Sequence, residues 1–108
     1  MPYYLIQVAY TPEAWAAMVK QPQNRLDAVA AVAERLGGKF EQAWLTFGEY
    51  DIIGILEMPD NTDAAAFAMA VSAGGACKAF KTTPLLTTEQ GLESMRKAQD
   101  LGYRPPGR

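Results

Sequence analysis

The residues that could carry chemistry gather between residues 48 and 57. Residues 48–51 read Gly-Glu-Tyr-Asp, so the phenol of Tyr50 is next to the carboxylate of Asp51 in the sequence. Such a pair could bind a small ligand or exchange a proton with it. The alternative is a hairpin turn, in which Gly48 takes a positive φ and Asp51 accepts hydrogen bonds from backbone amides. The pattern favours the turn and leaves a ligand-binding role open.

Glu57 is a carboxylate inside an apolar run. It has the same strand parity as Asp51, Ile53 and Ile55, so strict alternation would place all four on one face. A buried carboxylate has a raised pKa and could act as a general acid or base. The alternative is that Glu57 lies at the strand end before Pro59 and reaches water.

Two further positions are candidates for ligand binding. Gln7 is the polar exception in the apolar run 3–10, and it could hydrogen-bond a ligand or satisfy a backbone group. Trp44 is one of several aromatic residues in predicted strands. These could line a pocket for a flat organic molecule, but packing in a core or dimer interface explains them equally well.

The composition excludes several classes of function. The sequence has no histidine, which rules out His-based catalytic dyads, His-ligated haem and the common zinc sites. Cys77 is the single cysteine, so no intrachain disulfide can form. A net charge of −2 and the lack of a basic patch argue against nucleic acid or a membrane as partner. We expect a cytoplasmic protein with no metal and no cofactor.

Short elements bounded by capping residues must position these side chains. Thr11, Asn24 and Thr87 are suited to helix N-caps, and the pairs 37–38 and 74–75 are Gly-Gly helix ends. The stretch 60–63 resembles a calcium loop superficially but is typical of a helix cap. In the second strand, alternation predicts Phe40, Gln42 and Trp44 on one face. The sequence predicts strands over residues 3–10, 39–47, 51–58 and 76–86, and helices from 12, over 25–36, over 62–72, and from 87 to about 101.

This order predicts an α+β fold, the ferredoxin-like βαββαβ arrangement with an extra C-terminal helix. The four strands form one antiparallel sheet with the helices on one face. The first three strands carry apolar residues on both faces, so the second face also needs a cover. A second copy of the chain is the simplest cover, giving a homodimer of the dimeric α/β barrel type with an interface on the order of 2,000 Å² or more.

At residues 48–51, Gly-Glu-Tyr-Asp, the sequence resembles the GYD-domain family of small bacterial proteins. The tyrosine-rich first strand, the helix 25–36 closing on Gly-Gly-Lys, and the hairpin 45–57 are also similar. The resemblance covers residues 2–86 and departs in the fourth strand. It implies a ferredoxin-like, dimeric barrel fold and no assigned reaction. We therefore predict a GYD-like domain over residues 1–86, a C-terminal helix over 87–102 packed on the domain or its partner, and a tail over 103–108.

Two functions remain open at this point. The first is a homodimer or higher homo-oligomer that binds a small apolar or aromatic molecule or acts as an assembly unit. The second is a cofactor-independent monooxygenase or isomerase of the dimeric barrel type. The candidate ligand-binding residues for either function are Tyr50, Asp51, Glu57, Gln7 and Trp44.

Overall fold

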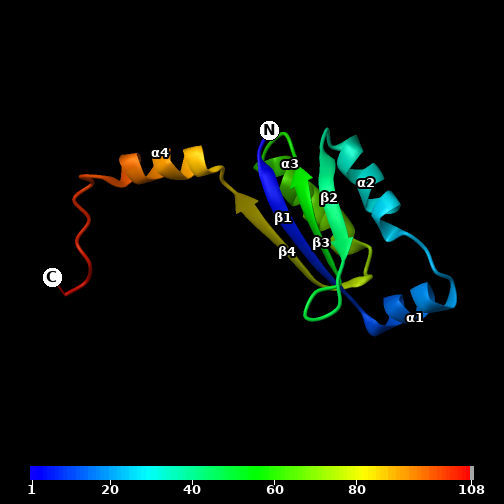
Figure 1. Ribbon diagram of the computed structural model, residues 1–108. Coiled ribbons are helices and arrows are strands. Elements are labelled where there is room, and N and C mark those ends of the chain that lie inside the picture. The colour runs from blue at the N-terminus through cyan, green and yellow to red at the C-terminus, as the bar shows by residue number, and fades with distance from the viewer. Residues whose placement is uncertain (108) are drawn as a thin grey trace.

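The computed structural model describes residues 1–107; the last residue of the predicted tail, Arg108, lies outside the described residues. Four antiparallel strands form one sheet in the order β2-β3-β1-β4 (Figure 1). The elements along the chain are β1 (Tyr3–Tyr10), α1 (Pro12–Lys20), α2 (Arg25–Arg35), β2 (Lys39–Leu45), β3 (Ile52–Glu57), α3 (Asn61–Ala73), β4 (Cys77–Leu85) and α4 (Thr88–Ala98).

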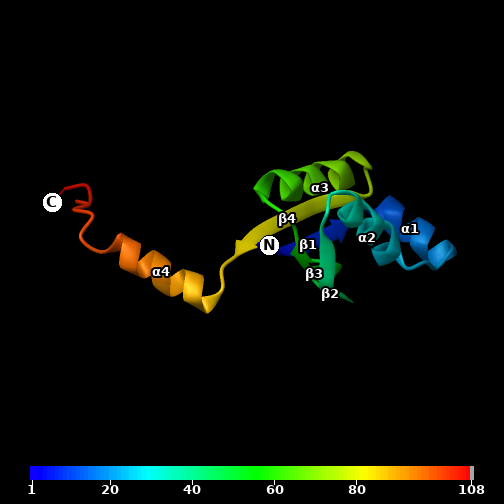
Figure 2. The ribbon, with the colours of Figure 1, turned by 90° about the horizontal axis from the view of Figure 1, so that it is seen from above.

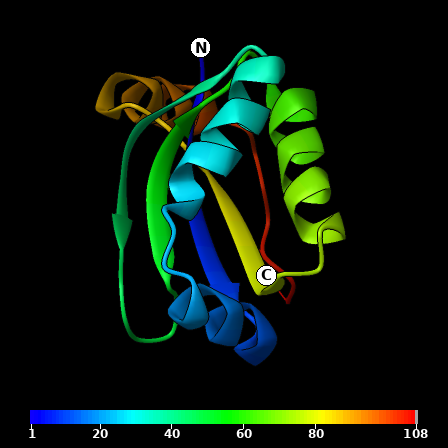
Figure 3. The same cartoon turned by 90° about the vertical axis from the view of Figure 1, so that its right-hand side faces the viewer.

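This topology is the predicted ferredoxin-like fold with one added helix. The two βαβ halves interleave, so β3 lies between β1 and β2, and β1 lies between β3 and β4. Helices α2 and α3 lie side by side over the same face of the sheet (Figure 3). The fold class is therefore confirmed as α+β.

The hydrophobic core fills the space between that face and the two helices. Alternate residues of β1 point into it, while Ala33 comes from α2 and Phe67 from α3. The rings of Phe40, Phe67 and Phe80 meet edge-on or tilted, with centroids about 6 Å apart. The fully buried side chains of largest volume are Tyr4, Phe67, Leu56 and Met58.

Side-chain caps start each helix as the sequence predicts. The side chains of Thr11, Asn24 and Asp60 accept hydrogen bonds from backbone amides in the first turns of α1, α2 and α3. Thr87 and Gln90 form the predicted capping box of α4. Helix α4 ends at Ala98 rather than near residue 101, because Gln99 adopts an extended conformation.

The Gly-Gly exit from α2 meets two separate backbone requirements. Gly37 takes a φ of +83°, which is accessible to glycine at little cost. Gly38 is buried, and a Cβ there would collide with the backbone oxygen of Glu57 and the sulfur of Met58. The pair therefore turns the chain and lets it approach β3 closely.

A bulge in β2 changes one predicted face. Phe40 pairs with Leu56, but the next paired residue, Gln42, is opposite Ile55, so Glu41 is extra. Phe40 therefore points into the core with the helices, whereas Gln42 and Trp44 remain on the opposite face. The prediction that all three share a face was wrong because simple alternation cannot detect an inserted residue.

The opposite face of the sheet, here called the open face, is covered by no helix of the described residues (Figure 2). It is formed by those alternate residues of each strand whose side chains point away from α2 and α3. Most of these side chains are apolar. Among them Leu5, Ile53 and Ile55 are only half-buried, and Trp44 is 52% exposed. The open face comprises Tyr3, Leu5, Gln7, Ala9, Lys39, Gln42, Trp44, Ile53, Ile55, Glu57, Ala79, Lys81, Thr83 and Leu85.

Helix α4 extends away from the rest of the molecule (Figures 1 and 2). Leu92 and Met95 on this helix are exposed. The radius of gyration is 17.5 Å, whereas a compact chain of this length has about 13 Å. Packing of α4 on a partner stays a prediction. No helix within residues 1–107 is long and apolar enough to cross a membrane.

Candidate functional site

Asp51 joins three segments of the chain. One of its carboxylate oxygens, Oδ2, accepts hydrogen bonds from the backbone N–H of Tyr10 at 2.9 Å and from the indole N–H of Trp15 at 3.2 Å. Its own backbone N–H donates to the carbonyl of Val8 at 2.7 Å. The carboxylate thus ties the end of β1 to α1, rather than capping the hairpin turn itself.

Tyr50 lies in the loop between β2 and β3. Its carbonyl accepts a hydrogen bond of 2.6 Å from the hydroxyl of Thr46. The backbone N–H of Thr46 donates to the carbonyl of Asp51 at 2.7 Å. Tyr50 and Asp51 therefore close the hairpin with their backbone carbonyls, so the segment is a turn as predicted, but the predicted capping by the Asp51 side chain was wrong.

Glu57 lies at the far end of β3, six residues from Asp51, or about 20 Å along the strand. A hydrogen bond shared with Glu41 raises the pKa of Glu57, and burial adds to the effect. The same hydrogen bond lowers the pKa of Glu41. Lys39 approaches both carboxylates, at 3.5 Å from Glu41 and 3.9 Å from Glu57. The bulge in β2 explains this pair, because it brings Glu41 to the side of Glu57.

Gln7 and Trp44 share the open face with Glu57. Both are in register with Ile53, one on each side of β3. Gln7 also pairs with Lys81 of β4. The structure therefore gathers three of the five sequence-predicted site residues on one sheet face and leaves Tyr50 and Asp51 at the hairpin end.

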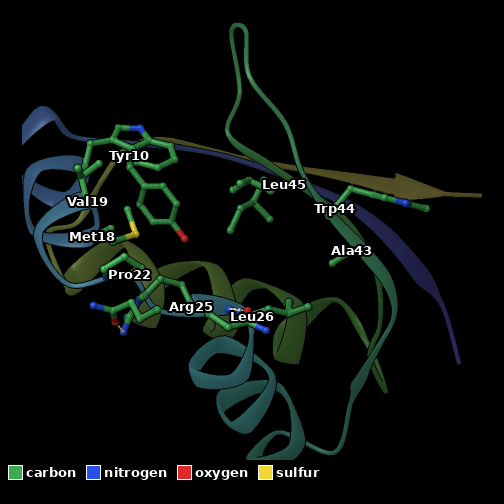
Figure 4. A pocket seen from close by; sticks show the side chains of 13 residues that line it. Tyr10, Met18, Val19, Pro22, Arg25, Leu26, Ala43, Trp44 and Leu45 are labelled. Atoms are coloured by element: carbon green, nitrogen blue, oxygen red, sulfur yellow. Dashed lines mark hydrogen bonds between the residues drawn. The ribbon is translucent and has the colours of Figure 1, made fainter.

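A cavity lies elsewhere, between α1, the start of α2 and the β2–β3 edge (Figure 4). Its volume is about 450 Å³. Figure 4 shows the hydroxyl of Tyr10 pointing into it, and the indole of Trp44 pointing away. The wall is formed by Tyr10, Trp15, Met18, Val19, Pro22, Gln23, Asn24, Arg25, Leu26, Ala43, Trp44, Leu45 and Ile52.

A second cavity of about 240 Å³ lies between α2, α3 and the sheet. It is lined almost entirely by apolar side chains, including Val29, Phe67 and Phe80. Tyr10, Arg25 and Ile52 belong to the walls of both cavities. These shared residues mark the place where the two cavities adjoin.

The polar groups at this junction influence one another. Burial raises the pKa of Tyr10, and neighbouring Cys77 and Asp51 raise it further, while the charge of Arg25 opposes them. Burial also raises the pKa of the Cys77 thiol, again opposed by Arg25. The phenol and the thiol are therefore protonated near neutral pH, and Arg25 supplies the positive charge.

Sequence reasoning did not single out Tyr10 and Arg25 as a pair. One signal was present: Arg25 occupies the first turn of α2, where the helix dipole disfavours a positive charge. A positive charge at this unfavourable end of the helix dipole suggests that Arg25 has a role other than stabilising the helix. That Arg25 and Tyr10 line the same cavities depends on how α2 packs over the sheet.

Comparison with known proteins bears on both the fold and the family. The crystal structure of FFRP-DM1 superposes with a TM-score of 0.50 at 15% identity, covering 80% of this chain and all of that one. At this identity the similarity supports the fold alone. A search of curated proteins finds no match.

The GYD domain family matches residues 4–95. The match extends beyond the residues 2–86 covered by the resemblance and includes most of α4. It contains the β2–β3 hairpin, both cavities and the open face apart from Tyr3. The chain belongs to the GYD domain family.

Proposed function

We propose that this GYD domain is a homodimeric module that binds a small apolar or aromatic molecule between its sheet and its helices. The cavity beside Tyr10 and Trp15 carries this proposal. Its volume of about 450 Å³ lies within the range of about 300–1,000 Å³ typical of ligand sites. Its wall combines mainly apolar side chains with a few polar groups, as such sites do.

The open face supports the dimeric part of the proposal. Leu5, Ile53 and Ile55 form an apolar centre that no part of residues 1–107 covers. The same face carries Lys81 on β4 and Glu57 on β3, charges of opposite sign that a two-fold axis can place opposite each other. Two open faces packed together would form a dimeric α/β barrel.

Ligand binding is tested by calorimetry with small aromatic probes, indole and 1-naphthol. Leu45→Asp places a charge on the cavity wall at a residue that is 71% exposed, so it should abolish binding while the fold is retained. Met69→Asp, at an equally exposed site on α3 outside both cavities, is the matched control. Equal binding by both variants would contradict this location of the site.

Dimerisation is tested by size-exclusion chromatography with light scattering. We expect a dimer at micromolar concentration, and a monomer for Ile55→Asp because a charge at the centre of the open face would be buried unpaired. Met69→Asp should remain dimeric. A stable wild-type monomer would overturn the dimer.

The alternative of a cofactor-independent monooxygenase or isomerase is favoured by one observation, the carboxyl pair of Glu41 and Glu57. The raised pKa of Glu57 suits a group that exchanges a proton on the open face. Oxygen uptake with anthrone, a readily ionised aromatic ketone, would test the monooxygenase. Its loss in Glu57→Gln, but not in Glu49→Gln on the hairpin loop, would support this alternative.

A further inference from the structure

The junction of the two cavities has a single cation set among apolar side chains. Arg25 belongs to both walls, together with Tyr10 and Ile52. No other lysine or arginine lines either cavity, and neither wall includes an aspartate or glutamate. The walls therefore have a net charge of one positive unit located at their junction.

Arg25 has no carboxylate partner among residues 1–107. Its guanidinium donates a hydrogen bond of 3.2 Å to the side-chain oxygen of Gln23, a neutral group. The nearby carboxylate of Asp51 already accepts two hydrogen bonds, from Tyr10 and Trp15. Arg25 as a residue is half-buried, and a guanidinium without a counter-ion is suited to pair with an incoming anion.

Tyr10 supplies a second donor at the same place. Its hydroxyl points into the larger cavity (Figure 4) and has no hydrogen-bond partner within the described part of the chain. The ring is fixed by an edge-to-face contact with Trp15, whose centroid is 5.7 Å away. A phenol held in the same cavity walls as Arg25 can donate to a carboxylate bound there.

We propose that the cavity binds an organic monocarboxylate, with the carboxylate held by Arg25 and Tyr10 and the apolar body lying along the cavity wall. This inference rests on the proposed function and names the ligand class for that site. A single positive charge compensates a single negative one, so a carboxylate fits better than a dianionic phosphate. Met18, Leu26 and Leu45 offer the surface for the apolar body.

The test compares acids with their neutral amides of nearly the same shape. Phenylacetate and octanoate are titrated into the full chain by calorimetry, with phenylacetamide and octanamide as the matched neutral probes. Because a hydrogen bond to a charged group contributes about 1.5–3 kcal/mol, each acid should bind roughly 10- to 100-fold more tightly than its amide.

Two variants separate the roles of the polar groups. Arg25→Gln should remove the preference for the acid and leave amide binding nearly unchanged. Tyr10→Phe should weaken acid binding by roughly threefold to tenfold, the effect of one neutral donor. Arg35→Gln, at the exposed last turn of the same helix, removes the same charge away from the cavity and should bind like the wild type.

The two tryptophans give an independent readout that does not rely on an arginine variant. Both tryptophans belong to the cavity wall, but the indole of Trp44 points away from the cavity. In Trp44→Phe, the remaining Trp15 fluorescence should change on addition of phenylacetate. In Trp15→Phe, the remaining Trp44 fluorescence should stay constant.

The outcomes separate the claim that the ligand is a monocarboxylate from the broader claim that the cavity binds a small molecule. If acids and amides bind equally, or Arg25→Gln behaves like Arg35→Gln, the monocarboxylate is overturned while small-molecule binding stands. If no acid, amide or neutral aromatic probe binds, both are overturned. Acid-selective binding lost in Arg25→Gln, with a Trp15 response, supports both.

Discussion

The two faces of the one sheet differ in how they are completed. On β3, Leu56 is fully buried beneath α2 and α3, whereas the adjacent Ile55 on the open face is half-buried. Both side chains are large and apolar, and they lie one residue apart. The difference shows that the chain completes one hydrophobic interface by itself and leaves the second uncovered within residues 1–107.

The two faces also differ in where their polar groups lie. On the helix-covered side, Arg25 and Tyr10 lie at the junction of two apolar cavities. On the open face, the proximity of Glu41 raises the pKa of Glu57, Lys39 lies 3.9 Å from Glu57, and Gln7 pairs with Lys81. The first arrangement suits a small anion, and the second suits a surface that meets another protein.

The largest expected effect compares the neighbouring residues of β3. Leu56→Ala should destabilise the fold by about 3 kcal/mol or more, because it leaves a cavity in the core. Ile55→Ala should cost about 1 kcal/mol in the monomer, and its cost should depend on protein concentration if the open face is a dimer interface. Urea denaturation at two protein concentrations measures both. Equal costs would remove the distinction between the faces.

The next effect concerns how α1 is held at the helix-covered side. Asp51→Ala should cost about 2 kcal/mol, since the N–H groups of Tyr10 and Trp15 lose their acceptor. Asp51→Asn keeps an amide oxygen as acceptor and should cost less. Thermal denaturation, followed by Trp15 fluorescence in a Trp44→Phe background, provides the measurement. A negligible cost for Asp51→Ala would show that packing alone holds α1.

A pH dependence distinguishes the open face. The pKa of Glu57 is raised above its ordinary 4.5 in the folded chain. The stabilisation from protonated Glu57 is therefore present below about pH 4.5 and lost as the pH rises through the raised value. Above pH 4.5, Glu57→Gln should have a higher melting temperature than the wild type, by a margin that grows until the pH passes the raised pKa of Glu57 and is constant above it. Glu49→Gln in the exposed loop should give no such trend.

The smallest effect is expected in α4, which belongs to neither face. Leu92→Ser changes an exposed side chain and should alter the free energy of unfolding by no more than about 0.5 kcal/mol. Urea denaturation measures this change, with Leu56→Ala as the reference for a buried site. A cost above 1 kcal/mol that depends on concentration would instead place α4 in a contact with a partner.

Much of the fold could be predicted from local signals. Thr11, Asn24 and Thr87 begin helices because their side chains can accept from the first free amides, and Gly37 ends one because it tolerates a positive φ. The face of Phe40 could not be predicted, because a bulge shows itself only in the pairing of β2 with β3. Of the candidate site residues, Tyr50 and Asp51 close the hairpin through their backbone carbonyls, whereas the Asp51 side chain binds Tyr10 and Trp15 instead of capping the turn. Gln7, Trp44 and Glu57 were placed together by strand register.

The sequence by itself determined the order of elements, the apolar character of both sheet faces and the exclusion of histidine chemistry, because these depend on residue type and short-range spacing. The tertiary structure decided which residues meet. Tyr10 and Arg25 are fifteen residues apart and lie in different elements. Only the packing of α2 against the sheet makes them walls of the same cavities, since such long-range contacts arise from the fold as a whole.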